Sequence, residues 1–328
     1  MRAPRDLVSD LPSIRLAFRE KSCESVQWAS FVPGVQGDSV HEVQCTWPIG
    51  AESGEGPCWS AREEALWFVD IERQCMHRFH PATGAHRTWP APSKVSFILP
   101  CCDGDFVIGM QGMLGRFAPE TGHIESLLTL ERDLPHNRLN DACVDPSGRL
   151  WFGSMDDRQQ DPHGVLYRWN GKSAPISCDD GYIISNGPAF SPDGRILYHT
   201  DSLSRVIYRF DVGEDGHLSH KKQFIEIARE AGCPDGSTVD VEGYVWVALY
   251  GGATVRRYSP DGKLVAAVSL PCPNVAKLAF GGKDLKTAFV TTARNRLAGK
   301  GHPVHQHEGG LFCFRVDVPG LPQQCVVR

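Results

Sequence analysis

Short apolar runs alternate with turn sequences along most of the chain, and the same order of runs and turns recurs. There are six repeats, and the first turn of each begins at Ser60, Asp103, Asp145, Ser191, Asp240 and Gly281, respectively. Each is followed by an apolar run, such as ALWFVD or RLWFGSM, and then by a third run that ends in a second turn. A period of about 40–50 residues with several short strands per repeat is typical of β-propellers. The pattern therefore predicts an all-β fold, a six-bladed β-propeller.

The two ends of the chain fit this repeat differently. Residues 1–38 lack the pattern and predict an N-terminal extension, whereas residues 39–328 predict a single propeller domain. Residues 41–47 (HEVQCTW) alternate as a strand does, and we expect this strand to close the ring against the last blade. Residues 223–231 (QFIEIAREA) are ambiguous between strand and helix.

Four polar residues share one position of the repeat, five residues before a turn. They are Glu55, Asn140, Asn186 and Asp235. The same count gives apolar residues, Ile98 and Ala276, in blades two and six. Each polar residue taken singly could merely shape a turn, since Asn-Gly and Asp-Gly are turn dipeptides. Four in register would instead meet at the centre of a radial fold. Two carboxylates and two amides suit a hard cation there, which predicts a central metal site.

Composition narrows the class of partner. The 328 residues include 34 basic and 39 acidic ones, for a net charge of -5, which argues against a nucleic-acid partner or a polybasic membrane anchor. No apolar run approaches the ~20 residues that span a bilayer. The 12 cysteines contain no CxxC pair, and the N-terminal residues have no apolar signal core. We therefore expect reduced cysteines that pack as small core residues, and a cytoplasmic protein.

Several motifs resemble one family. Gly-Glu-Gly-Pro-x-Trp at 54–59, Arg-x-Asn-Asp at 138–141, Ser-Asn-Gly at 185–187 and Pro-Asp-Gly at 234–236 stand in order along the chain. Together with stretches such as DPSGRLWFGSM, they resemble the gluconolactonase, senescence-marker-protein (regucalcin) and luciferin-regenerating-enzyme family over roughly residues 40 to 320. The resemblance implies a six-bladed propeller with one divalent cation in its channel, and hydrolysis of a sugar lactone such as gluconolactone or a pentonolactone.

The resemblance also implies residue roles. Glu55, Asn186 and Asp235 match the metal ligands, Asp235 also matches the acid/base residue, and Arg138 with Asn140 matches the substrate-binding pair. Counting through the motif to the family's acidic substrate contact reaches Arg158, beside Asp156 and Asp157, which departs from the family pattern. Oxygen ligands favour Ca²⁺ as the bound cation, and Mg²⁺, Mn²⁺, Zn²⁺ and Fe²⁺ are the alternatives.

Other interpretations stay open at this point. A related metal centre could hydrolyse a phosphotriester or an aryl ester, and a propeller could bind a metal or a protein without catalysis. The cluster His302-x-x-His305-x-His307 lies in a Gly- and Lys-containing loop and predicts a solvated rim more than a metal site. We expect a monomer or a weak homo-oligomer, with a small-molecule sugar lactone as the substrate.

Overall fold

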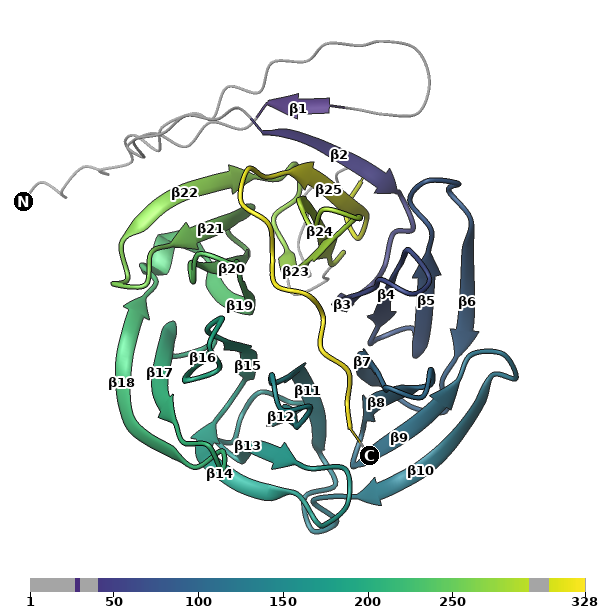
Figure 1. Cartoon of the computed structure of the whole chain (residues 1–328), viewed down its shortest axis with the longest axis vertical. Helices are drawn as coiled ribbons and strands as arrows, with labels where there is room; N and C mark the ends of the chain where they lie inside the picture. Colours follow the sequence, from purple (N-terminus) through teal and green to yellow (C-terminus); the bar gives the residue numbers. More distant parts are fainter. Residues whose placement is uncertain (1–26, 30–40, 295–306, 328) are drawn as a thin grey trace, which may run out of the picture.

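The computed structural model describes residues 27–29, 41–294 and 307–327. It confirms the six-bladed β-propeller (Figure 1): six antiparallel sheets surround one centre, and the innermost strand of each runs along the channel. Within this part of the chain the only helix is the short 3-10 helix η1 (Arg229–Ala231), which resolves the ambiguous stretch into the end of a strand followed by one turn of helix. No helix of the described residues is long and apolar enough to cross a membrane.

The first five blades each consist of four consecutive strands, from the channel outward. Blade one contains β3 (Gly54–Ser60), β4 (Ala65–Asp70), β5 (Cys75–Phe79) and β6 (His86–Pro90). Blade two contains β7 (Val95–Pro100), β8 (Phe106–Met110), β9 (Met113–Ala118) and β10 (His123–Thr129). Blade three contains β11 (Asn137–Val144), β12 (Leu150–Asp156), β13 (Gly164–Trp169) and β14 (Ile176–Tyr182). Blade four contains β15 (Ser185–Phe190), β16 (Ile196–Asp201), β17 (Val206–Val212) and β18 (Leu218–Glu226). Blade five contains β19 (Cys233–Val239), β20 (Val245–Tyr250), β21 (Thr254–Tyr258) and β22 (Leu264–Ser269).

Blade six closes the ring with strands from both ends of the chain. It contains β23 (Val275–Gly281), β24 (Thr287–Thr292), β25 (Leu311–Arg315), β2 (Glu42–Trp47) and β1 (Gln27–Ala29). The antiparallel pairing of β2 with β25 is the predicted closure. It holds the N-terminal and C-terminal parts of the propeller in one sheet, so the ring cannot open between the first and last blades without breaking this pairing. The predicted extension, residues 1–38, lies outside the described residues except for β1.

The core lies between neighbouring blades. The recurring aromatic residues of the second strands are almost fully buried there, as their repeat position predicts: Trp67, Trp151, Tyr198 and Trp246. The indole Nε1 of Trp151 donates to Asp145 at 2.9 Å, and that of Trp246 donates to Asp240 at 2.9 Å. These bonds join the start of the turn to the strand that follows it, so they hold the turn in place and satisfy the buried indole N–H.

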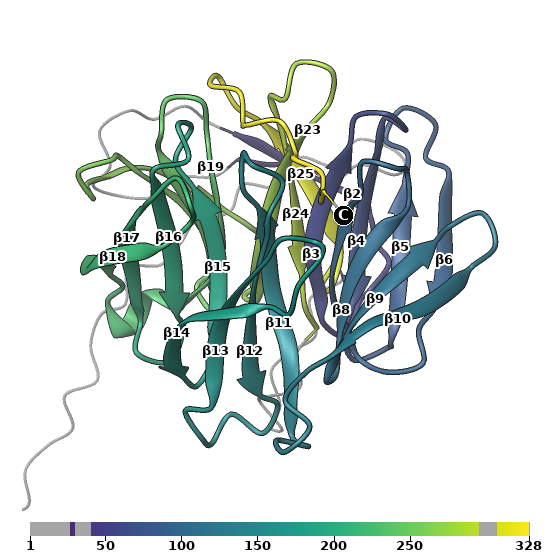
Figure 2. The ribbon, with the colours of Figure 1, turned by 60° about the horizontal axis from the view of Figure 1, so that its bottom comes forward.

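A segment after β25 crosses one face of the ring (Figures 1 and 2). It contacts the turn of blade five at Gly320, then blade two, where Val326 N donates to Pro100 O at 2.8 Å. Here the expectation of fully reduced cysteines is wrong, because Cys102 and Cys325 form a disulfide across a sequence separation of 223 residues. Single-sequence spacing gives no sign of such a pair. Eight further cysteines of the described residues are free thiols: Cys45, Cys58, Cys75, Cys143, Cys178, Cys233, Cys272 and Cys313.

Candidate functional site

The predicted site residues lie together in one cavity of about 680 Å³ at one mouth of the channel. Its lining includes all five of them: Glu55, Arg138, Asn140, Asn186 and Asp235. The C-terminal segment crosses the other face, because it contacts the turns at the opposite ends of the inner strands.

A β-bulge shapes each of the four inner strands at these residues. Between the ladder pairs Glu55↔Val69 and Cys58↔Trp67, two residues of β3 face one residue of β4. The inner strands of blades three, four and five have the same irregularity, directly beside or at the site residue. A bulge bends the strand and turns its side chains away from the normal alternation. Gly56 and Gly187, which follow Glu55 and Asn186, have φ values of 53° and 54°, a conformation that favours glycine.

The structure corrects the expected equivalent in blade two. There the backbone pair that opens the turn, Cys101 N to Asp105 O at 2.8 Å, corresponds to Asp145 N to Arg149 O in blade three. The turn therefore begins two residues earlier than predicted, and the equivalent of Glu55 is Ser96 instead of Ile98. Ser96 is buried and donates to Gly109 O, and neither residue lines the site cavity.

Glu55 and Asp235 form the acidic part of the site. Burial, and then the negative charge of Asp141, raises the pKa of Glu55 from 4.5 to about 7. Burial and the charge of Glu55 raise the pKa of Asp235 well above its ordinary value. Glu55 accepts one hydrogen bond, from Gly56 N at 3.1 Å, and the Asp235 carboxylate accepts none from the described residues. Two mutually repelling carboxylates with unused lone pairs are suited to a cation between them.

Amide side chains connect the acidic pair to the substrate side. Asn140 Nδ2 donates to Asn186 Oδ1 at 2.7 Å, and Asn186 Nδ2 donates to Ser202 Oγ at 3.0 Å. These bonds fix the orientation of the Asn186 amide. Its oxygen keeps a second lone pair, so it can bind a cation while it accepts from Asn140. Two carboxylates and one amide oxygen fit a hard divalent cation. The candidate site contains only two acidic ligands, and the described ranges hold no cluster of three or more His, Cys, Asp or Glu side chains placed to bind a metal.

Arg138 is held rigidly beside these amides. Its Nε donates to Asp157 Oδ1 at 2.7 Å, and its Nη1 donates to Asn140 Oδ1 at 2.5 Å and Leu139 O at 3.0 Å. Within the described part of the chain its Nη2 donates no hydrogen bond, so two N–H groups stay free for a ligand in the cavity.

Asp157 is a cavity residue that the sequence analysis did not assign to the site. The motif count reached Arg158, but the Arg158 guanidinium pairs with Asp156 at 3.1 Å and Asp161 at 3.1 Å and does not line the cavity. Asp157 does line it, and binds both Arg138 and Lys94, the latter at 2.9 Å. Burial opposes its ionisation, but the charges and hydrogen bonds of Arg138 and Lys94 outweigh this and lower the pKa of Asp157.

The two charged partners of Asp157 connect it to a continuous chain of hydrogen bonds around the cavity. It runs through Glu72, Lys94, Asp157, Arg138, Asn140, Asn186 and Ser202, from blade one to blade four. Of the three histidines in the predicted rim, His307 lies half-buried in a turn before β25, whereas His302 and His305 lie outside the described residues. They therefore stay an untested prediction.

The chain is similar to known proteins over most of its length. It is 33% identical over 280 residues to the 6-deoxy-6-sulfogluconolactonase of Pseudomonas putida, with 82% of this chain and 93% of the relative covered. It is 33% identical over 276 residues to a pentonolactonase of Haloferax volcanii, with 82% and 93% covered. A solved regucalcin of Agrobacterium tumefaciens, described as a calcium-binding protein, matches with a TM-score of 0.82, 28% identity and coverage of 86% and 96%. Residues 53–294 match the model of the SMP-30/gluconolactonase/LRE-like region, and the chain belongs to this family.

Proposed function

We propose that this protein is a metal-dependent hydrolase that opens a sugar lactone to the corresponding aldonic acid. The observation that carries the proposal is the gathering of Glu55, Asn186 and Asp235 with the Arg138–Asn140 pair in one cavity. The names of two relatives, a sulfogluconolactonase and a pentonolactonase, support a sugar lactone as the substrate class. The calcium-binding relative supports a divalent cation, with Ca²⁺ as the first candidate.

Glu55, Asn186 and Asp235 would hold the cation through side-chain oxygens. When bound, the cation would supply Lewis-acid polarisation of the lactone carbonyl. Arg138 and Asn140 would bind the sugar hydroxyls, Arg138 as a donor through its free Nη2 and Asn140 as an acceptor through the second lone pair of its Oδ1. Both Nδ2 hydrogens of Asn140 are already donated, to Ser185 O and Asn186 Oδ1. Asp157 and Lys94 keep Arg138 in place before the substrate arrives, which lowers the entropic cost of orienting it.

Asp235 would move the proton. Lactone hydrolysis adds water to the carbonyl carbon and breaks the bond between that carbon and the ring oxygen. The Asp235 carboxylate takes a proton from the attacking water and then gives it to the leaving ring oxygen, which becomes a hydroxyl of the aldonic acid. Asp235 is buried, lines the site cavity and accepts no hydrogen bond from the described residues, so its carboxylate oxygens are available for this proton transfer.

A pH-stat assay tests this function. Purified protein is supplied with gluconolactone, several pentonolactones, an aryl ester and one phosphotriester, before and after chelation and with Ca²⁺, Mn²⁺ or Zn²⁺ added back. We expect lactone hydrolysis that chelation removes and a cation restores, with a loss of at least about 10²-fold in kcat for Asp235→Asn. The control Asp261→Asn, at an exposed turn of the same blade, keeps wild-type activity. Faster hydrolysis of the phosphotriester or the aryl ester would replace the lactonase assignment. An intact protein that is inactive on every substrate would indicate a binding module.

A further inference from the structure

The residue that follows the site position in each blade forms a second layer across the channel. In blades one, four and five it is glycine, Gly56, Gly187 and Gly236. In blades three and six, which face each other across the ring (Figure 1), it is Asp141 and Lys277. A carboxylate and an ammonium therefore meet at the channel centre, one layer below the candidate metal ligands.

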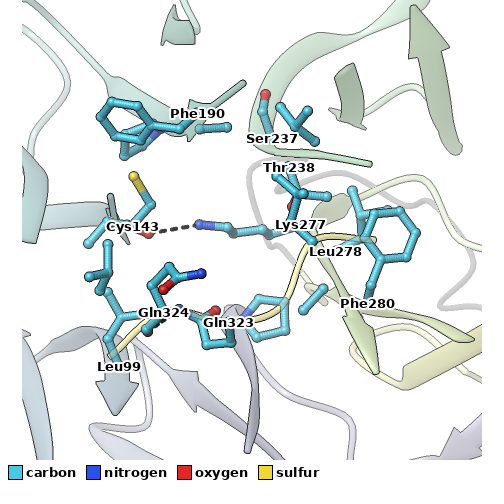
Figure 3. Close-up of a pocket in the computed structure, with 18 of the residues that line it drawn as sticks. Leu99, Cys143, Phe190, Ser237, Thr238, Lys277, Leu278, Phe280, Gln323 and Gln324 are labelled. Atoms are coloured by element: carbon cyan, nitrogen blue, oxygen red, sulfur yellow. Dashed lines mark hydrogen bonds between the residues drawn. The ribbon is translucent and has the colours of Figure 1, made fainter. Parts of the chain in front are cut away.

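Asp141 and Lys277 form a buried ion pair. Their side chains are 5% and 8% exposed, and Lys277 Nζ donates to Asp141 Oδ1 and, at 3.2 Å, to Ala142 O. Figure 3 shows the Lys277 side chain reaching toward Cys143 from the opposite side of the pocket. Burial disfavours its charge, but Asp141 more than compensates and raises the pKa of Lys277. The Asp141 carboxylate therefore stabilises the buried ammonium of Lys277.

Asp141 is anchored to the backbone beside the metal site. Its Oδ2 accepts from Gly187 N at 2.9 Å and its Oδ1 accepts from Ala142 N at 2.7 Å. Gly187 directly follows Asn186, so this carboxylate also fixes the turn that presents a candidate ligand. Three carboxylates therefore gather at the channel centre, those of Glu55, Asp235 and Asp141, and the charge of Asp141 raises the pKa of both Glu55 and Asp235.

The fold makes room for the lysine at one specific place. A Cβ atom on Gly236 would lie 2.3 Å from Lys277 Cγ and 2.4 Å from Lys277 Cβ, so any side chain there would collide with the lysine stem. Gly236 directly follows Asp235. The lysine stem thus packs on the backbone that carries the candidate base.

The ion pair also separates two cavities. The site cavity is lined by Glu55, Asn140, Asn186 and Asp235. The other, of about 270 Å³, is lined by Lys277, by residues one to three positions further along the same strands, and by the C-terminal segment (Figure 3). Lys277 lines only this second cavity and Asp141 lines neither, which places the pair between the two.

We propose that Lys277 sets the charge of the metal site. By pairing with Asp141 it withdraws the third carboxylate from the cation, so Glu55 and Asp235 alone present two negative charges, which match a divalent ion. Without Lys277 the site would hold three carboxylates and favour ions of higher charge. Without Asp141 an uncompensated ammonium would lie beside the cation. The inference depends on the metal site proposed above.

Binding of Ca²⁺ and Tb³⁺ at pH 8 tests this role, by titration calorimetry and by Tb³⁺ luminescence. Lys277→Met keeps the stem over Gly236 and removes the charge. We expect it to tighten Ca²⁺ about tenfold and Tb³⁺ by a larger factor, because attraction grows with ion charge. Asp141→Asn should weaken Ca²⁺ at least about tenfold. The double variant Asp141→Asn/Lys277→Met restores neutrality and should lie within about threefold of wild type.

A matched control separates charge from mere stability. Arg257→Met breaks another ion pair, between the half-buried Arg257 and the buried Asp240, just after the far end of β19. It should lower Tm and leave Ca²⁺ affinity unchanged. If both single variants shift Ca²⁺ affinity in the same direction, or neither shifts it, the charge-setting role is wrong. If Lys277→Met does not fold, Lys277→Gln takes its place with the same expected direction. Wild-type protein that binds neither ion would overturn the proposed metal site itself, which is a different result.

Discussion

Replacing Glu55 by glutamine should stabilise the metal-free protein while it weakens the metal site. The pKa of Glu55 is raised from 4.5 to about 7, so the folded state binds its proton more tightly than the unfolded state does. The resulting stability is fully present below pH 4.5 and is lost as the pH rises through about 7. At pH 8 the ionised carboxylate therefore costs the metal-free protein up to about 3 kcal/mol, from 1.36 kcal/mol per pKa unit. Glu55 keeps part of its surface open to the cavity, and solvent there reduces this cost, so the figure is an upper limit.

Glutamine keeps the shape of the side chain and the acceptor for Gly56 N but removes the charge. In chelator at pH 8 we expect Glu55→Gln to unfold at a higher temperature than wild type, by several degrees, with the difference shrinking towards pH 5. With Ca²⁺ the order reverses, because only the wild type gains the stability that ligand binding supplies. Thermal unfolding followed by circular dichroism, at pH 5, 6.5 and 8, measures both effects.

An exposed residue supplies the control for this prediction. Glu120→Gln, at a surface turn of blade two, should change neither curve. A metal-free Glu55→Gln that is less stable than wild type at pH 8 would show that the carboxylate is stabilised by a partner. That result would refute the argument that Glu55 is held in place for a cation.

Three further predictions follow from the same structure. Asp157→Asn removes a charge-assisted bond to Arg138 and should lower kcat/KM for lactones about tenfold, mainly through a higher KM. An unchanged KM would show that Asp157 has no role in substrate binding. Deletion of residues 41–47 removes the strand that pairs with β25, so Tm should fall by well over 10 °C, and a near-wild-type Tm would contradict ring closure. Cys102→Ser removes the link to the C-terminal segment and should lower the stability of the oxidised protein by about 2–4 kcal/mol in denaturant unfolding, while reduced wild type and reduced variant should unfold alike.

The fold was predictable because its information is local and repeated. Each turn and the strand after it recur with similar spacing, and the alternation of HEVQCTW identified the closing strand before any contact was known. The one error of register came in blade two. There the turn at Cys101 lacks the Pro-containing pattern seen in blades three and four, so counting from the nearest Asp-Gly displaced the equivalent residue from Ser96 to Ile98.

Only the part of the site that occupies equivalent positions of the repeat was predictable from the sequence. Equivalent positions led to the four polar residues that the structure gathers in one cavity. The difference between Arg158 and Asp157 is one residue, yet in a strand or an adjoining turn one residue moves a side chain to the opposite side. Asp141 and Lys277 are 136 residues apart in the sequence and lie in opposite blades, so no local sequence pattern predicts their ion pair. Its one available signal was the charge at two positions where three other blades have glycine.

The position of the cation tests the central claim most directly. Crystals grown with Mn²⁺ or Ca²⁺, with anomalous diffraction data collected from them, would locate the ion without reference to activity. We predict one principal anomalous peak in the channel, within coordination distance of side-chain oxygens of Glu55, Asn186 and Asp235, and its loss in Asp235→Asn crystals. A fully loaded crystal whose peak lies elsewhere, or whose peak persists in the variant with the other two residues unengaged, would contradict the account.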